Sequence, residues 1–182
     1  MRVYISAAHS CGKSTLARYI SEKYNLPMVH ETARMILSEK ELNINSLRTD
    51  LNVVDSYQRD IFKRQLLEEE KHIDFVSDRS FDFLAYSAQH TRILPELLSD
   101  PMLLKYIEKL REPDSYIFFI RPSKSTLKDD GIRETLNWDG VVAIDAMIKL
   151  LLQMFGLRYF MISTDSMQER AQLVDAILSL KK

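Results

Sequence analysis

Residues 7–15 read Ala7-Ala8-His9-Ser10-Cys11-Gly12-Lys13-Ser14-Thr15, and they restrict the possible folds more than any other segment of the chain. They follow an apolar run at residues 3–7, which predicts a buried strand. They lead into residues 14–24, where apolar side chains recur at helical spacing. A strand, a loop containing Gly-Lys-Ser-Thr and a helix in this order are typical of a phosphate-binding loop.

The residue types in this loop suit the binding of a nucleotide and a metal ion. Backbone N–H groups of such a loop surround the phosphate oxygens, and the helix N-terminus adds partial positive charge. Lys13 supplies a cation for the β- and γ-phosphates, and the Ser14 hydroxyl is a ligand for Mg²⁺. We therefore assign ATP binding to Ala8, His9, Ser10, Cys11, Gly12, Lys13, Ser14 and Thr15.

One position departs from the usual pattern, G-x-x-x-x-G-K-[ST]. Its first glycine is replaced by Ala7, which resists a positive φ, so we expect ordinary backbone dihedrals there. The competing interpretation is a chance match in a loop that only connects a strand to a helix. The agreement between the Gly-Lys-Ser-Thr core and its flanking segments favours the phosphate-binding loop.

The composition is that of one globular domain. The chain has 182 residues, of which 46% are hydrophobic, and a formal net charge of −1. This charge balance argues against partners bound by bulk electrostatic attraction, such as nucleic acid or a membrane surface. The single cysteine, Cys11, excludes an intrachain disulfide and fits a reducing, cytoplasmic location. We expect one domain over residues 1–182, with no membrane span. A homodimer is compatible with the sequence.

Short apolar runs alternate with helical patterns along the chain. Strands are predicted at residues 3–7, 28–30, 75–77, 116–120 and 158–163. Helices are predicted at residues 14–24, 33–39, 49–72, 81–88, 100–110, 138–155 and 166–180. This alternation predicts an α/β fold, with a parallel sheet covered by helices on both faces. Ligands of such sheets bind beyond the carboxyl ends of the strands, so the polar residues that follow each strand are the candidates for function.

Two such residues, Asp78 and Arg79, follow the third predicted strand. A carboxylate there is well placed to hold Mg²⁺ beside Ser14, and Arg79 can grip a phosphate group with two N–H donors. The competing interpretation makes Asp78 the N-cap of the next helix and Arg79 a solvated charge. The nearby phosphate-binding loop favours the functional interpretation.

Glu31 and Arg34 follow the second predicted strand. In kinases with this architecture a carboxylate at this position faces the acceptor, where Glu31 can orient or deprotonate an attacking hydroxyl. The alternative is a glutamate in the first turn of a helix, stabilised by the helix dipole and paired with Arg34.

A polar and basic segment at residues 121–135 follows the fourth predicted strand. We expect it to form a lid over the triphosphate, in which cations such as Arg121 and Arg133 neutralise charge that develops during transfer. Arg133 is the preferred cation. The alternative is an exposed loop with paired lysine and aspartate side chains.

Aromatic and amide side chains gather on the helix at 49–72 and on the one after Asp78. This cluster could stack on a planar base and read it; its members are Tyr57, Gln58, Phe62, Gln65, Phe81, Phe83 and Tyr86. Aromatic residues at helical spacing more often belong to the core, which is the competing interpretation.

These motifs together resemble the P-loop kinase group that contains the ribosylnicotinamide kinase domain of NadR, and they are similar to thymidylate and deoxynucleoside kinases. The resemblance spans roughly residues 2–163. It rests on the phosphate-binding loop, Glu31 to Arg34, Asp78 to Ser80 with Asp82 and Tyr86, Gln65, and Asp130 to Arg133.

The resemblance implies a three-layer α/β/α P-loop kinase fold, with a five-stranded parallel sheet in the order 2-3-1-4-5. It implies ATP and Mg²⁺ as cofactors, and an acceptor with a ribose or deoxyribose hydroxyl or phosphate. By this resemblance Glu31 approaches the acceptor, Arg79 contacts its reacting end and Arg133 contacts the donor phosphates.

The sequence thus predicts ATP- and Mg²⁺-dependent phosphoryl transfer to a small acceptor, a nucleoside or nucleoside monophosphate. The predicted catalytic residues are Lys13, Glu31, Asp78, Arg79 and Arg133. The predicted acceptor contacts are Glu31, Arg34, Phe62, Gln65, Arg79 and Tyr86. Ser14 and Asp78 are the predicted metal ligands, and Arg121 joins the nucleotide contacts.

Two alternatives stay open at this point. The chain could phosphorylate a hydroxymethylated base within DNA, although its charge balance argues against a basic groove. It could also be a nucleotide-gated binding module, in which the lid switches a partner surface and no small molecule is phosphorylated. A guanine-binding Asn-Lys-x-Asp motif is absent from the sequence, which argues against a GTPase.

Overall fold

The computed structural model describes residues 1–30, 36, 50–126 and 138–180. Within these residues five parallel strands form one sheet in the order β2-β3-β1-β4-β5. The strands are β1 (Arg2–Ala7), β2 (Met28–Val29), β3 (Phe75–Ser77), β4 (Ser115–Ile120) and β5 (Phe160–Ile162). The predicted α/β class and the strand order 2-3-1-4-5 are both confirmed.

The central strand, β1, carries the phosphate-binding loop at its carboxyl end. It pairs with β4 along its whole length, from Arg2 beside Ser115 to Ala7 beside Ile120. It also pairs with β3 on its other side. Both β1 and β4 are buried throughout, as expected of strands covered on two faces. The edge strand β5 is less covered, and two of its three residues are exposed.

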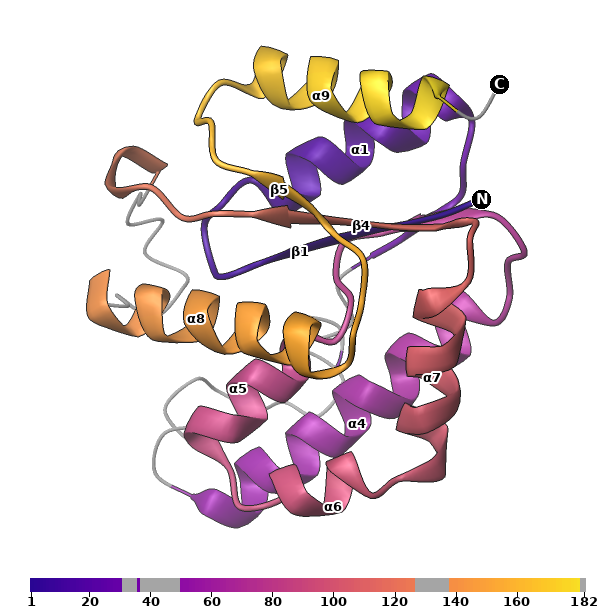
Figure 1. Ribbon diagram of the computed structural model, residues 1–182. Helices are drawn as coiled ribbons and strands as arrows, with labels where there is room; N and C mark the ends of the chain where they lie inside the picture. The colour runs from indigo at the N-terminus through magenta and orange to yellow at the C-terminus, as the bar shows by residue number, and fades with distance from the viewer. Residues whose placement is uncertain (31–35, 37–49, 127–137, 181–182) are drawn as a thin grey trace.

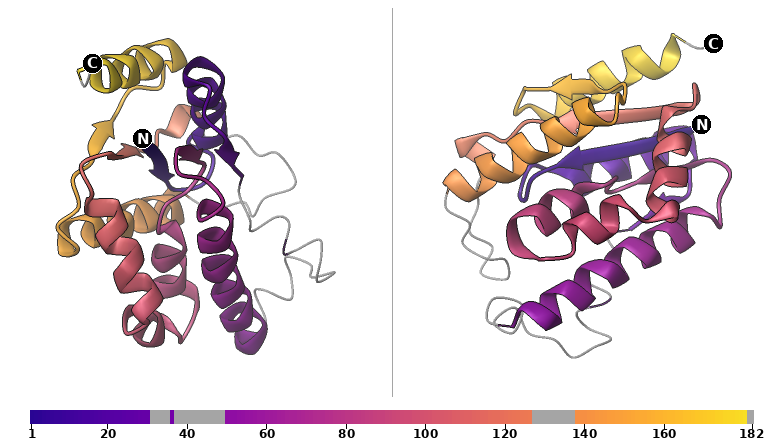
Figure 2. Two further views of the ribbon diagram at one scale, coloured as in Figure 1. Left: turned by 90° about the vertical axis from the view of Figure 1, so that its right-hand side faces the viewer. Right: turned by 60° about the horizontal axis from the view of Figure 1, so that its bottom comes forward.

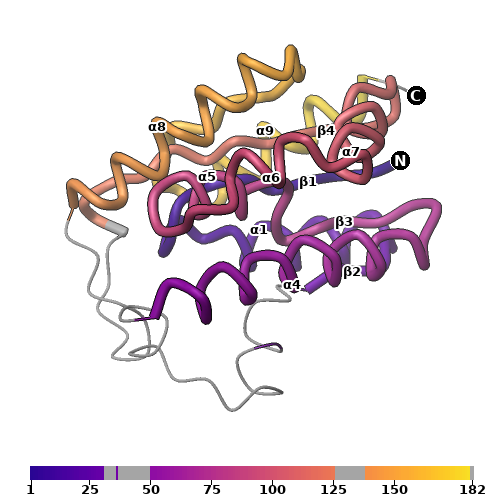
Figure 3. Tube along the Cα trace, turned by 90° about the horizontal axis from the view of Figure 1, so that it is seen from below, coloured from indigo at the N-terminus to yellow at the C-terminus, as the bar shows by residue number. Residues whose placement is uncertain are grey.

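Helices cover the sheet in two layers, shown in Figure 1. Helices α1 and α9 lie on one face, and α4, α5, α6, α7 and α8 lie on the other. Their bounds are α1 (Lys13–Tyr24), α4 (Leu51–Glu69), α5 (Asp82–His90), α6 (Leu94–Leu98), α7 (Pro101–Arg111), α8 (Trp138–Met154) and α9 (Met167–Ser179). Figure 2 shows the same layers from two further directions, and Figure 3 shows α5 between α4 and α8.

Side-chain caps explain where several helices begin. Asp50 accepts hydrogen bonds from the backbone N–H groups of Asn52 and Val53 at the start of α4. Asp100 caps α7 in the same way, and Ser166 caps α9. Helix α1 has no such cap, because Gly12 occupies that position in a left-handed conformation, with φ of 82°. The N-terminal N–H groups of α1 are therefore left without a side-chain acceptor at its cap.

The structure also differs from the sequence expectations in places. Helix α4 spans residues 51–69 and not the predicted 49–72, because Asp50 caps its start and the chain turns at residues 70–71. The short helix α6 was not predicted; Pro95 in its first turn and the buried Leu97 account for it. The predicted helix at 33–39 lies outside the described residues apart from position 36. In the described part of the chain, every helix is too short or too polar to cross a lipid bilayer.

Candidate functional site: a phosphate-binding loop at the sheet edge

The backbone of the loop makes its tight turn at two left-handed residues. Ser10 has φ of 57° and Gly12 has φ of 82°. Ala7 is not among the described residues with positive φ, which confirms the expectation of ordinary dihedrals there. The left-handed residues of this loop therefore lie at its middle, three and five positions after Ala7.

Lys13 lies against the backbone of its own loop. Its Nζ donates to the carbonyl oxygens of Ala7, at 2.8 Å, and Ala8, at 2.7 Å. The side chain is largely buried, with 8% of its surface exposed. The ammonium group therefore lies at the carboxyl end of β1, where a phosphate cradled by the loop would need a cation.

Asp82 holds the start of the loop through two hydrogen bonds. This fully buried carboxylate, at the start of α5, accepts a hydrogen bond from the Ser6 hydroxyl and a long one, 3.4 Å, from the Ala7 N–H. It thus ties α5 to the end of β1. Asp82 contributed to the sequence resemblance, and its contacts give it a structural part at the site.

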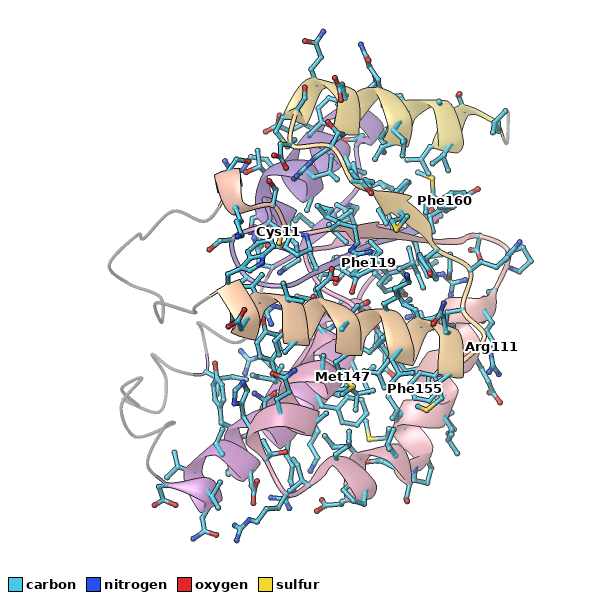
Figure 4. All side chains as sticks on the ribbon, turned by 60° about the vertical axis from the view of Figure 1, so that its left-hand side comes forward. Cys11, Arg111, Phe119, Met147, Phe155 and Phe160 are labelled. Atoms are coloured by element: carbon cyan, nitrogen blue, oxygen red, sulfur yellow. The ribbon has the colours of Figure 1, made fainter. Side chains whose placement is uncertain are left out.

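Arg170 supports the middle of the loop, and sequence reasoning missed it. Its Nη1 donates to the Cys11 carbonyl at 2.6 Å, and its Nε donates to the Thr164 carbonyl at 2.7 Å. In Figure 4 Cys11 lies at the level of the sheet, between α9 above and α8 below. Arg170 is 159 positions from Cys11, so no local motif joins them. The one available signal was its place on the otherwise apolar buried face of α9, with Val174 and Leu178.

Asp78 and Arg79 lie directly beyond β3, beside the loop. Both are buried, at 4% and 7% exposed, and the Asp78 N–H donates to the Val29 carbonyl of the neighbouring strand. Helix α5 begins four residues later and has Phe81 at its N-cap. The alternative in which Asp78 caps this helix is therefore wrong.

A row of three side chains connects Arg79 to the loop. The Arg79 guanidinium carbon lies 6.0 Å from the centre of the Tyr86 ring. The Tyr86 ring in turn lies 4.7 Å from the ring of His9. His9, Tyr86 and Arg79, which come from separate segments, are thus adjacent. Their contacts with a ligand stay predictions.

Two other predicted acceptor residues have partners inside the protein. The Gln65 Nε2 donates to the Ser80 carbonyl at 2.7 Å and also to Glu69 and Tyr106. Phe62 is 1% exposed and stacks on Phe83, with ring centres 4.9 Å apart. In the structure these side chains belong to the core, and their acceptor contacts stay predictions.

Gln58 is the other amide of the cluster predicted to read a planar base. It lies seven residues before Gln65, so the two share one face of α4. Gln58 is 7% exposed, and among the described residues its Oε1 has no hydrogen-bond partner. A buried amide oxygen without a donor is costly, which makes it a candidate contact for a ligand N–H group.

Arg121 is held by an acidic side chain of α8. Its Nε and Nη2 donate to the two carboxylate oxygens of Asp145, at 3.0 and 2.9 Å. The described part of the predicted lid continues into a 3₁₀ turn, η1 (Lys124–Thr126), where the Lys124 Nζ lies 5.5 Å from the centre of a Trp138 ring. Residues 127–135 of that lid, with Arg133, lie outside the described residues, as do Glu31 and Arg34.

The residues present fit a magnesium ion that binds mainly to water and phosphate. No group of three or more His, Cys, Asp or Glu side chains in the described residues could hold a metal ion alone. Ser14 is half-buried at the start of α1, and Asp78 lies beyond β3, the strand next to β1. One hydroxyl and one carboxylate are the small protein contribution that Mg²⁺ takes when a nucleotide supplies further ligands.

Comparisons with known proteins agree with this architecture. Residues 2–170 match the sequence model of a family described as AAA domain. No curated protein sequence matches the chain.

Three solved structures show the same fold. Deoxyadenosine kinase from M. mycoides with bound dCTP has a TM-score of 0.68 and 14% identity, covering 98% of this chain and 99% of that one. The YorR protein from Bacillus subtilis, in complex with phosphorylated GDP, has a TM-score of 0.62 and 14% identity, covering 100% and 97%. NadR in complex with NAD and AMP-PNP has a TM-score of 0.64 and 19% identity, covering 97% of this chain. The chain spans about half of NadR, 48% of its length. These likenesses confirm the P-loop kinase fold.

Proposed function

The chain belongs to the AAA domain family, and we propose that within it this protein is a P-loop kinase that transfers the γ-phosphoryl group of ATP to a small acceptor. The acceptor that the site supports best is a nucleoside or a nucleoside monophosphate. A cytoplasmic location, where ATP and such acceptors occur together, is part of the proposal.

The proposal is carried by two sets of residues that follow the carboxyl ends of the neighbouring strands β1 and β3. The loop with Lys13 supplies phosphate donors, and the buried Asp78 and Arg79 follow the neighbouring strand. The ring of His9, a loop residue, lies against the Tyr86 ring, and Tyr86 lies between His9 and Arg79. A switch that only binds nucleotide would also use Asp78 for its metal ion, but it would have no acceptor for the buried Arg79 to hold.

Each residue then has a role in transfer. The loop N–H groups and Lys13 bind the β- and γ-phosphates and balance the charge that spreads over them. Ser14 and Asp78 hold Mg²⁺, which would supply Lewis-acid stabilisation of the phosphate oxygens. Arg79 positions the acceptor, and Glu31 orients or deprotonates its hydroxyl.

The buried Gln58 side chain supports an acceptor that carries an N–H or amino group. Its buried Oε1 would accept a hydrogen bond from a base N–H or amino group. Among the structural neighbours, deoxyadenosine kinase acts on a nucleoside and has been seen with dCTP. Shikimate kinase shares the fold, so the acceptor class rests on the residues of this chain and not on the fold.

The test is a screen of nucleosides and nucleoside monophosphates for acceptor-dependent ADP release in the presence of Mg²⁺. Lys13→Met is the control, because it keeps the aliphatic stem and removes the cation. We expect turnover with one acceptor group, and a loss of more than about 100-fold in the control. ATP binding with no turnover on any small acceptor would favour the nucleotide-gated module. Turnover on DNA that contains hydroxymethylated bases would favour the other alternative.

A further inference from the structure

Arg170 is a buried cation that joins two segments far apart in the sequence. Its side chain is 2% exposed, although arginine is seldom fully buried unless it is paired. One guanidinium nitrogen donates to the Cys11 carbonyl in the phosphate-binding loop, and another donates to the Thr164 carbonyl in the turn before α9. The same side chain therefore fixes the loop to the last strand–helix connection of the fold.

The contact to Cys11 determines which way one peptide group of the loop points. The peptide between Cys11 and Gly12 is planar, and in a trans peptide the C=O and N–H bonds point in opposite directions. Because Arg170 holds the Cys11 oxygen, the Gly12 N–H is directed away from Arg170. An N–H group directed to the other side of the loop is one that the loop can offer to a phosphate.

Gly12 and Arg170 are also matched in size. A Cβ at position 12 would lie 3.1 Å from the Arg170 Nη1, tighter than ordinary van der Waals contact, and φ of 82° disfavours any residue other than glycine. The arginine thus approaches the loop as closely as it does because position 12 has no side chain.

The charge of Arg170 is only partly balanced. Its Nη2 lies 4.0 Å from the Asp165 carboxylate, and among the described residues it has no hydrogen-bond partner. Asp165 is 44% exposed and also accepts hydrogen bonds from the Ser123 and Ser125 hydroxyls. A buried guanidinium with a distant, solvated counterion adds positive potential behind the loop.

We propose that Arg170 is a positioning residue for the donor phosphates. It orients the Cys11–Gly12 peptide, adds positive potential to the loop and fixes the loop to the turn at residues 164–166. This inference rests on the proposed function, because it presumes that the loop binds the phosphates of ATP.

The test compares Arg170→Met and Arg170→Lys with a control on the same pair of helices. Lys23→Met is the control, because Lys23 pairs with Asp175 of α9 at the end of α1 that lies farther from the loop. For each folded variant we would measure the melting temperature, the affinities for ATP and inorganic tripolyphosphate, and the kcat and KM for ATP. Tripolyphosphate probes the loop without a base or a ribose.

For Arg170→Met we expect affinities for both ATP and tripolyphosphate to fall by about 10- to 100-fold, which is the loss of one charge-assisted hydrogen bond. The affinities of Arg170→Lys for ATP and tripolyphosphate should lie between those of Arg170→Met and the wild type. Lysine keeps the positive charge but loses the paired N–H donors. The control should lower the melting temperature alone.

Wild-type affinities in a folded Arg170→Met protein would overturn the inference. If that variant does not fold, unchanged affinities in Arg170→Lys would overturn it equally. A wild-type protein that binds ATP and tripolyphosphate but phosphorylates no acceptor would contradict the proposed function alone. Binding of neither probe would contradict both.

Discussion

Arg121 and Asp145 form a bidentate ion pair that joins the end of β4 to the middle of α8. The Asp145 side chain is 2% exposed, whereas that of Arg121 is 35% exposed. Burial raises the pKa of the Asp145 carboxyl, and the adjacent guanidinium opposes that rise. The third guanidinium nitrogen, Nη1, lies 3.8 Å from the Met161 sulfur. Arg121 was predicted to contact the nucleotide, so its role is open to a direct test.

We expect Asp145→Asn to destabilise the protein by roughly 1–3 kcal/mol, less than for a fully buried pair because Arg121 is partly solvated. Arg121→Gln should lower the free energy of unfolding by a similar amount. Chemical unfolding of both variants measures this, and ATP affinity separates the two roles. A fall in ATP affinity confined to Arg121→Gln would support the nucleotide contact. Equal affinities in both variants would leave Arg121 with a structural role only.

Asp78→Asn should raise the Mg²⁺ concentration needed for half-maximal activity by about 10-fold or more, because a neutral amide is a weaker ligand than a carboxylate for a hard cation. Affinity for metal-free ATP should change little. Asp74→Asn is a suitable control, since this exposed carboxylate precedes the same strand and pairs with the N-terminal amine. Identical Mg²⁺ requirements in Asp78→Asn and Asp74→Asn would contradict the metal role of Asp78.

The parts of the site that were predictable are those that one short segment encodes. Gly12, Lys13 and Ser14 are consecutive, and the strand before them and the helix after them follow from apolar periodicity. The strand order followed from a resemblance that combined several such segments. Local pattern was sufficient because each element buries its own apolar face.

The supporting contacts were not predictable, because they join residues distant in sequence. Nothing near Cys11 indicates that its carbonyl accepts from Arg170, 159 residues away. Nothing near Arg121 indicates that Asp145, in the middle of α8, is its partner. Gln65 and Gln58 are both amides on one face of α4, and only the fold distinguishes the one with internal partners from the one with an orphaned oxygen.

Glu31→Gln should separate transfer from nucleotide binding. If Glu31 orients or deprotonates an acceptor hydroxyl, the amide keeps its shape but accepts no proton, and turnover should fall by roughly 10²- to 10⁴-fold. ATP affinity should stay near that of the wild type. If the acceptor is a monophosphate, the loss should appear mainly in the acceptor KM. The test measures turnover and ATP affinity on Glu31→Gln. An equal loss of both would contradict the role of Glu31 toward the acceptor.

Glu69 is a buried carboxyl group that should make the stability of the protein depend on pH. It is 0% exposed, at the end of α4. Its Oε1 accepts hydrogen bonds from Gln65 at 3.0 Å, and from Ser77 and Tyr106 at 3.2 Å each. Burial raises its pKa to about 7, and these hydrogen bonds and the charge of Lys109 only partly offset that rise.

The folded protein therefore holds the Glu69 proton to a higher pH than the unfolded chain, in which the pKa is 4.5. Stability is unaffected by this group below pH 4.5, falls as pH rises from 4.5 to about 7, and stays reduced above that. The interval between the two pKa values corresponds to about 3 kcal/mol. Glu69→Gln should remove this loss, because the amide stays neutral at every pH.

Urea unfolding of the wild type and of Glu69→Gln at pH 5, 6, 7 and 8 measures the difference. We expect the variant to gain stability relative to the wild type as pH rises, by up to about 3 kcal/mol between pH 5 and 8. Glu68→Gln is the control on the same helix, because Lys71 lowers the pKa of Glu68 and its contribution has the opposite sign. Glu68→Gln should therefore lose stability above pH 5 as the wild type does. Parallel stability profiles for the wild type and Glu69→Gln would mean that Glu69 is ionised in the folded protein throughout this range.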